Sequence, residues 1–227
     1  MSRKRKYNDL YNDIKENPVN INNRCTDYNS TCINWAVWRN DIDRFNNLIK
    51  IDNIDVNSPD RIGYTPLISS CLKGSPLMVK KLIEINADVN LIGGRKKNTP
   101  LMESVYFGKH NSTQILMDLG ADPNLMNKGQ LPLINACRSG SINSINILLN
   151  YPQTDLDIVD KYNRHAYKNA ANKKIKKMLI NTQNKKIDKL MNILYETLYE
   201  YDSLHIGILK IIIEYTFEDF SKKKINF

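Results

Sequence analysis

The chain has 227 residues and a formal net charge of +9, and its charges are unevenly distributed. Residues 1–6 carry four positive charges and no negative ones, residues 7–160 carry 15 positive and 17 negative charges, and residues 161–227 carry 14 positive and 7 negative charges. The basic character lies at the two ends, so the body lacks the continuous basic stripe that a duplex-binding protein presents.

Neither end has the features of a secreted or membrane protein. No apolar stretch follows the basic residues 3–6, as it would in a signal peptide. The most apolar segment near the end, 206–213, contains Lys210 and is far shorter than the ~20 residues of a membrane-spanning helix. We therefore expect a soluble intracellular protein. Residues 3–6 are either a solvated terminus or a nuclear import signal or nucleic-acid contact.

A three-residue motif recurs at a fixed spacing. Thr-Pro-Leu occurs at 65–67 and again, 34 residues later, at 99–101. Each copy is followed by an apolar, helix-like run and then by a closing phrase, Ala-Asp-Val-Asn at 87–90 and Ala-Asp-Pro-Asn at 121–124. The register returns in five units, at Thr31, Thr65, Thr99, Leu131 and His165. A period of this length predicts stacked repeats, which offer a binding surface rather than an active-site cleft.

The first predicted element in the chain is half a repeat at residues 7–22. Residues 13–22 align with residues 48–57 at a step of 35, which places Asn22 in the register of Asn57. Because a solenoid needs a polar cap over its apolar end, we expect this half-repeat to cover the first full unit.

Each following unit is predicted to contain two helices. Pro66 and Pro100 suit the first turn of a helix, and the Thr before each can cap that turn with its hydroxyl. Gly74, Gly108 and Gly140 share the register at which the first helix must end. Apolar residues at helical spacing predict the buried faces of the second helices: Val79, Leu82, Ile83, Ile115, Leu116, Leu119, Ile145, Leu148 and Leu149.

The segment 60–67, with Gly74 and the phrase at 87–90, resembles the ankyrin repeat. The resemblance covers roughly residues 27–181, although Cys32 replaces the proline of unit one and unit five keeps little of the motif. It implies an all-α ankyrin-repeat solenoid in which each repeat is a β-turn and two antiparallel helices. The predicted division is a basic N-terminus with a half-repeat cap at 1–26, five ankyrin repeats at 27–181 and a helical tail at 182–227.

The resemblance also implies a partner-binding face. In ankyrin arrays the turn tips and the outer positions of the first helices line a concave surface that commonly binds proteins. The turn positions here are Arg61, Tyr64, Arg95, Lys96, Asn98, Lys128 and Gln130. The helix positions form a ladder of Trp38, Leu72, Tyr106, Arg138 and Asn172. Trp, Tyr and Arg dominate binding hot spots. The alternative is that Trp38 and Tyr106 pack against neighbouring units and are mostly buried.

The residues that catalysis or metal binding would need are not grouped in this sequence. Cys71 and Cys137 share a register that favours a small buried residue, and Cys25 and Cys32 lack the paired spacing of a zinc site. The three histidines fall in different units, and the glycines at 93–94 lie in a repeat turn rather than a phosphate-binding loop. We therefore expect no enzymatic activity, no metal and no cofactor.

The tail is predicted to be an amphipathic helix at 185–201 followed by a second helix at 204–215 that Ser203 caps. Residues 203–220 resemble the opening of an F-box, although His205 replaces the expected proline and Gly207 the expected acidic residue. Ankyrin repeats with such a truncated F-box-like end are the layout of many proteins of large DNA viruses of the poxvirus or giant-virus type. There the end recruits a cullin-type ubiquitin ligase and the repeats hold the target.

The F-box resemblance implies an apolar ligase-binding face that docks into a groove of the ligase's linker protein, as helix-in-groove binders do. Its residues here are Leu204, Ile208, Leu209, Ile212 and Tyr215. The alternative is a helix that only caps the stack. A ligase box of the suppressor-of-cytokine-signalling type fits less well, because Ile208 stands where a Cys or small residue is expected.

These patterns together predict a non-enzymatic protein-binding scaffold, monomeric and located in the host cytoplasm or nucleus. Its leading specific function is that of a substrate adaptor for a cullin-type ubiquitin ligase. The competing hypotheses are a decoy or scaffold without ligase contact, and a basic-ended nuclear or nucleic-acid-associated factor.

Overall fold

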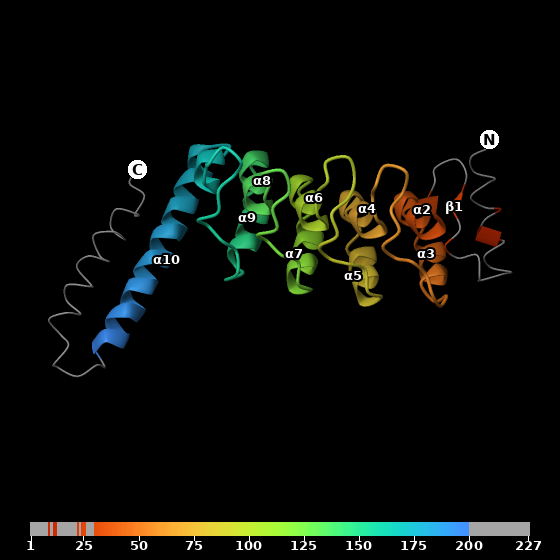
Figure 1. Cartoon of the computed structure of the whole chain (residues 1–227), viewed down its shortest axis with the longest axis horizontal. Helices are drawn as coiled ribbons and strands as arrows, with labels where there is room; N and C mark the ends of the chain where they lie inside the picture. Colours follow the sequence, from red (N-terminus) through yellow and green to blue (C-terminus); the bar gives the residue numbers. More distant parts are fainter. Residues whose placement is uncertain (1–8, 10, 13–21, 23, 26–29, 200–227) are drawn as a thin grey trace.

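The computed structural model describes residues 9, 11–12, 22, 24–25 and 30–199, which form a single row of helix pairs (Figure 1). Four pairs follow one another: α2 (Cys32–Arg39) and α3 (Ile42–Leu48), α4 (Pro66–Lys73) and α5 (Pro76–Glu84), α6 (Pro100–Tyr106) and α7 (His110–Asp118), and α8 (Pro132–Ser139) and α9 (Ile142–Leu149). The row ends with the 3₁₀ helix η2 (Ala166–Asn169) and the long helix α10 (Lys173–Tyr199). The predicted all-α solenoid is therefore confirmed.

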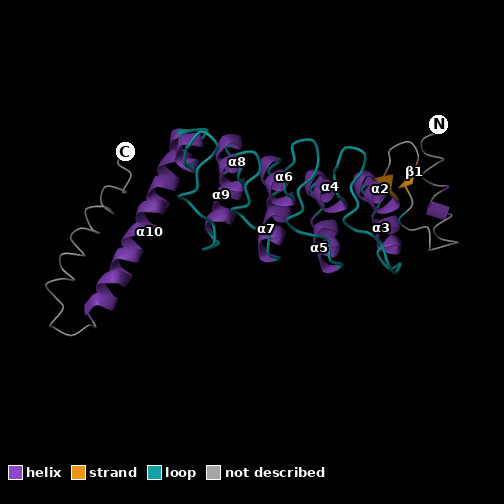
Figure 2. Cartoon of the chain, viewed as in Figure 1, coloured by secondary structure: helices purple, strands orange, loops and turns teal. Residues whose placement is uncertain are grey.

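Strand structure is confined to short turn elements within the described residues. Strands β1 (Arg24–Cys25) and β2 (Ser30–Thr31) form one antiparallel pair ahead of α2. Later turns contain single antiparallel bridges, Gly93 with Asn98 and Asn127 with Gln130. The connections between successive pairs project beyond the helices along one edge of the row (Figure 2). The β-turn expected in each repeat is therefore present in the central units.

The first helices begin where the Thr-Pro pairs predict. Pro66 and Pro100 are the first residues of α4 and α6. The Oγ1 atom of Thr65 accepts a hydrogen bond from the N–H of Ile68 at 3.2 Å, and Thr99 makes the equivalent bond at 3.1 Å. Each hydroxyl thus satisfies one of the backbone donors that a helix start leaves unpaired.

The ends of the first helices need a left-handed backbone conformation. Gly74 has φ +70° and Gly140 has φ +75°, as expected of glycine at this position. Asn40 occupies the same register after α2 with φ 54°. Asparagine tolerates this conformation better than most residues, which explains why the first unit turns without a glycine.

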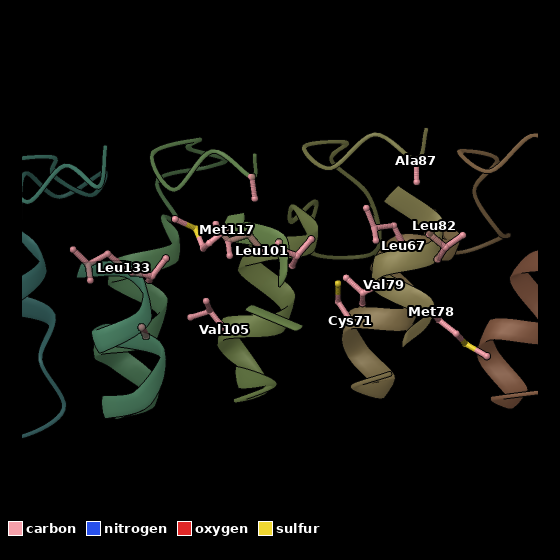
Figure 3. Close-up of a cluster of buried hydrophobic side chains, with 14 of the residues drawn as sticks. Leu67, Cys71, Met78, Val79, Leu82, Ala87, Leu101, Val105, Met117 and Leu133 are labelled. Carbon is pink, nitrogen blue, oxygen red and sulfur yellow. The ribbon is translucent and has the colours of Figure 1, made fainter. Parts of the chain in front are cut away.

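The core lies between successive helix pairs, where small and branched side chains interdigitate. Leu67, Cys71, Leu82 and Leu101 are all at most 1% exposed. Figure 3 shows these side chains gathered between the ribbons of neighbouring units, with Met78 reaching toward the preceding pair. Because each first helix packs against the first helices before and after it, burial is continuous along the row.

A ladder of asparagines joins the first four units. The Oδ1 atoms of Asn57, Asn90 and Asn124 accept hydrogen bonds at 2.8–2.9 Å from the N–H of the first Asp in the next closing phrase. Asn22 makes the same bond one unit earlier, to the N–H of Asp55 at 2.7 Å. Asn22 thus has the role that the predicted 35-residue step assigns to it. The rest of the aligned segment, 13–21, lies outside the described residues.

The fifth unit was expected to contain a pair of helices, and the tail was expected to begin a separate helix. The structure differs from both expectations. The first helix is replaced by the single turn η2, and α10 runs without a break for 27 residues. The predicted helix at 185–201 therefore corresponds, up to Tyr199, to the later part of α10, and residues 200–201 lie outside the described residues. Asn172 is not a first-helix ladder residue, because its Oδ1 caps α10 by accepting a bond from the N–H of Ile175 at 2.9 Å.

The early part of α10 anchors it to the array, since Ile175, Leu179 and Ile180 are buried. Its later part extends away from the row (Figure 1). The predicted ligase-binding face of Leu204, Ile208, Leu209, Ile212 and Tyr215 lies outside the described residues.

Candidate protein-binding surface

The aromatic members of the predicted ladder are on the surface. Trp38 of α2 and Tyr106 of α6 are each 46% exposed, so the alternative that they are mostly buried is wrong. Each ring carries a lysine ammonium: Lys73 Nζ lies 3.9 Å from the Trp38 ring centroid, and Lys96 Nζ lies 3.6 Å from that of Tyr106. Cation–π contacts of this kind hold the rings in place while leaving their edges accessible.

Four of the predicted residues meet in one groove of about 510 Å³ at the N-terminal end of the array, which we call the aromatic groove. They are Trp38, Arg61, Tyr64 and Arg95, and the wall is completed chiefly by Trp35, Arg39 and Ile62. The lining is therefore largely apolar, with arginines at its margin.

The turn that carries Tyr64 is held by two local devices. Asp60 Oδ1 accepts hydrogen bonds from the N–H groups of Ile62 and Tyr64 at 2.8 and 2.9 Å. The Tyr64 ring lies against the backbone of Gly94, where an added Cβ would be 2.1 Å from Tyr64 Cε1. Tyr64 is thus held in the wall of the aromatic groove by hydrogen bonds from its turn to Asp60, and by glycine at position 94, which leaves space for its ring.

Three other predicted residues line a second groove of about 480 Å³ at the C-terminal end of the array, which we call the basic groove. They are Lys128, Gln130 and Arg138, and the lining also includes Lys161, Tyr162, Arg164 and Lys168. Five cationic side chains thus surround one groove, and no carboxylate is among its lining residues.

The basic groove is organised by Asp160, whose side chain is fully buried beneath it. Its Oδ2 accepts hydrogen bonds from Nη2 of Arg138 at 3.0 Å and from Nη2 of Arg164 at 2.8 Å. Its Oδ1 accepts the N–H groups of Tyr162 and Arg164. Burial alone would raise the pKa of the Asp160 carboxyl, but these hydrogen bonds outweigh it and hold the pKa well below its usual range.

The structure corrects one predicted contact residue. Asn98 is only 1% exposed, and its Nδ2 donates to Glu103 Oε1 inside α6 at 3.0 Å. Its backbone N–H and C=O are both paired with Gly93. Asn98 therefore closes the turn and cannot contact a partner in this conformation. Glu103 is itself only 1% exposed. Burial is the largest effect on its carboxyl and raises the pKa of that group.

The remaining predicted contacts differ in accessibility. Arg61, Arg95, Lys96, Lys128 and Arg138 are exposed. Those that are only partly exposed are Tyr64, Leu72 and Gln130. We call the predicted ladder and turn residues, without Asn98 and Asn172, the ladder surface.

Sequence reasoning missed several groove residues. Lys161 and Arg164 occupy the turn registers of Arg61 and Tyr64 in the fifth unit, so extending the repeat pattern would have found them. Lys168 had no such signal, because it falls in the register of Ile68, which is buried in its own unit. It reaches the surface because η2 replaces the helix there.

Metal ligands, thiols and membrane-spanning helices are the other features of the described part of the chain that bear on function. No group of His, Cys, Asp and Glu side chains could hold a metal ion there. Burial raises the pKa of the Cys137 thiol to about 12 and that of Cys71 further, so neither is a thiolate at neutral pH. None of the described helices combines the length and apolarity needed to span a bilayer.

Comparison with known proteins agrees with this architecture. A family model described as ankyrin repeats (3 copies) matches residues 33–127 and 101–192. An ankyrin repeat protein of Acanthamoeba polyphaga mimivirus is 33% identical over 113 residues, which cover 47% of this chain and 69% of that protein.

Two further relatives are much longer than the matched region. SMC5-SMC6 complex localization factor protein 1 of Bos taurus is 30% identical over 45% of this chain, and an Arabidopsis thaliana protein named as an E3 ubiquitin-protein ligase is 38% identical over 36%. The alignments span only 10% and 18% of those two proteins. From the family match over most of the helix pairs and the repeat geometry described above, the chain belongs to the ankyrin-repeat family.

Proposed function

We propose that this protein is a non-enzymatic scaffold that binds a partner protein on the ladder surface, with Trp38 and Tyr106 as the anchoring side chains. The observation that carries the proposal is their equal exposure, 46%, at equivalent positions of α2 and α6. Large aromatic residues held at the surface of a rigid frame lose little conformational freedom on binding, and they dominate interface energetics.

The family assignment supports the same conclusion. Ankyrin repeats are protein–protein interaction modules that are generally without enzymatic activity. The core side chains behind the ladder surface are buried, and Leu67 and Leu101, for example, are each 1% exposed. Few core residues are therefore accessible to a partner. The accessible side chains of the turns and the first helices therefore determine which protein is bound.

The test is affinity purification of the full-length chain from cells with mass spectrometry, comparing wild type with the Trp38→Ala/Tyr106→Ala variant. Leu77→Ala/Leu119→Ala is the matched control, because Leu77 is 48% exposed and Leu119, which the sequence pattern wrongly predicted to be buried, is 40% exposed on the second-helix side. We expect the double aromatic variant to lose specific partners at an unchanged Tm, and the control to keep them. Retention of the same partners by both variants would contradict the proposal.

We further propose, as the more specific function, that the protein is a substrate adaptor for a cullin-type ubiquitin ligase. The F-box-like residues 203–220 favour this, and the relative named as an E3 ubiquitin-protein ligase is consistent with it. The competing proposals are a scaffold or decoy without ligase contact, and a nuclear factor that uses residues 3–6.

The adaptor proposal is tested by comparing the full-length protein with a chain that ends at residue 202. Cullin and linker subunits should be recovered only with the full-length protein, while partners of the ladder surface should be recovered with both. If the intact chain captures no ligase subunit, the adaptor function is wrong and the scaffold function stands. Salt-sensitive nucleic-acid binding that depends on residues 3–6 would favour the nuclear alternative instead.

A further inference from the structure

We propose that the basic groove binds an acidic segment of the partner protein, a short run of Asp and Glu side chains. This inference rests on the proposed scaffold function and adds the chemistry of what one end of the ladder surface recognises. Three observations support it: the charges of the side chains that line the groove, the burial of the Asp160 carboxylate, and the smaller net charge along the rest of the array.

The positive charges of the basic groove are only partly neutralised by the protein itself. Asp160 is the carboxylate that pairs with Arg138 and Arg164, and its side chain is 0% exposed, so a partner meets the cations rather than the aspartate. Among the described residues, no ion pair involves Lys128, Lys161 or Lys168. Five positive charges against one buried negative charge leave a net charge of +4 around the groove.

The two arginines are held in place and still partly accessible. Arg138 Nε donates to Asn169 Oδ1 at 3.1 Å while its Nη2 donates to Asp160, and Arg164 donates to Asp160 through both Nε and Nη2. Their side chains are 38% and 41% exposed. Guanidinium groups fixed in this way can accept carboxylates with little loss of side-chain entropy.

The three lysines of the basic groove differ in their contacts. Lys161 packs against Gly129, where an added Cβ would lie 2.5 Å from Lys161 Cβ, and its Nζ is 4.9 Å from the Tyr162 ring centroid. Lys128 and Lys168 are exposed at the margin of the groove. Lys128 and Lys168 therefore add exposed ammonium groups to the fixed guanidinium groups of Arg138 and Arg164.

The largest excess of positive charge lies at one end of the array, which favours an acidic peptide over a nucleic acid. Residues 30–122 carry 11 positive and 10 negative charges, so no basic stripe continues along the array. The aromatic groove holds three arginines beside Asp60, a net charge of +2, and its other lining side chains are aromatic, apolar or uncharged polar. A nucleic acid would instead be expected to engage the exposed lysines of α10 as well, such as Lys174 and Lys176.

The experiment is an NMR titration of the full-length protein with an eight-residue peptide of alternating Glu and Asp. A peptide of alternating Gln and Asn is the uncharged comparison, and a single-stranded oligonucleotide of eight phosphates is the nucleic-acid comparison. We expect shifts of the Gly129, Tyr162 and Asn169 amides with the acidic peptide, weakened by added salt, and none with the uncharged one.

The variant pair is Lys128→Gln/Lys168→Gln and, as control, Lys174→Gln/Lys176→Gln, which removes the same charge outside the groove. The arginines and Lys161 are kept, because they hold Asp160 and pack on Gly129. The groove variant should weaken acidic-peptide binding about three- to tenfold, and the control by much less.

Equal losses in both variants, or equal binding of the uncharged peptide, would overturn the inference. Tighter binding of the oligonucleotide with equal sensitivity to both variants would assign the site to nucleic acid. The peptide result is independent of the Trp38 and Tyr106 experiment. A negative titration with intact partner capture therefore rejects the acidic-segment inference and leaves the scaffold function.

Discussion

Asn22 Oδ1 accepts a hydrogen bond from the N–H of Asp55 at 2.7 Å, and its Nδ2 donates to the carbonyl of Asn53 at 2.8 Å. Asn124 makes the same pair of bonds to Asp155 and Gln153. One short side chain thus joins each closing phrase to the next, from Asn22 to the closing phrase of the fourth unit.

The asparagine ladder predicts a loss of stability when one member is truncated. Asn90→Ala removes the acceptor for the N–H of Asp122 and should destabilise the protein by about 1 kcal/mol. Asn111→Ala, at an exposed position of α7, should be neutral or slightly stabilising because alanine favours helix. Urea denaturation measures both. Equal destabilisation by the two variants would count against a role for the ladder.

The threonines before the first helices allow a comparison within the chain. Thr65→Val should cost about 1 kcal/mol, because it removes the hydroxyl that caps α4. Thr31→Val should be neutral or stabilising, since the buried Oγ1 of Thr31 has no hydrogen-bond partner. Urea midpoints of the two variants test this, and a larger loss at Thr31 would show that the cap is not the cause.

The Asp160 network predicts a pH-dependent contribution to stability. Asp160→Asn should cost about 2 kcal/mol at pH 7, because it removes the charge that both arginines share. The folded-state pKa of Asp160 is lowered, so its stabilisation is complete above the ordinary carboxyl value near ~3.9 and is lost as the pH falls toward the folded pKa.

The measurement for this prediction is the free energy of unfolding of wild type and variant between pH 7 and pH 2.5. The difference between them should be constant down to about pH 5 and then shrink. Asp52→Asn, at an exposed aspartate, is the control and should show little effect. A difference that grows on acidification would have the wrong sign.

The contact between Tyr64 and Gly94 predicts a specific effect on the aromatic groove. Gly94→Ala and Gly120→Ala both place a side chain at positive φ, +73° and +89°. Only the first creates a clash, because nothing lies within 4 Å of a Cβ at Gly120. Gly94→Ala should therefore cost roughly 1–3 kcal/mol more than Gly120→Ala.

Tryptophan fluorescence can report this effect, since the two tryptophans of the chain both line the aromatic groove. Displacement of Tyr64 by Gly94→Ala should change the emission of Trp35 and Trp38, whereas Gly120→Ala should leave it unchanged. Identical spectra for the two variants would mean that Gly94 does not position the groove wall.

Local signals in the sequence were sufficient for the repeat frame. Thr65 and Pro66 specify a helix start, and Gly74 specifies its end, through interactions within a few residues. The register placed Trp38 and Tyr106 at the same ladder position but left open whether they are exposed, and the structure shows that each is 46% exposed. The register could not predict a hydrogen bond that depends on the identity of one particular neighbouring residue. Asn98 turns inward because Glu103, five residues later, accepts its amide.

The fifth unit shows the other limit of sequence reasoning. Its motif residues predicted a pair of helices, but Asp160 draws Arg164 and Asn169 into one network around a single 3₁₀ turn. That network, rather than the repeat pattern, exposes Lys168 and completes the basic groove. The proposed ligand chemistry of this groove therefore arises where the repeat is least regular.

The unbroken course of α10 has a mechanical consequence. At about 1.5 Å per residue, its 27 residues form a rod of roughly 40 Å whose base is locked into the last unit. One residue inserted near its middle would rotate the outer half by about 100°, so the phase of the helix sets the direction in which the chain leaves the array. The rod therefore fixes both the distance and the direction between the last unit of the array and Tyr199.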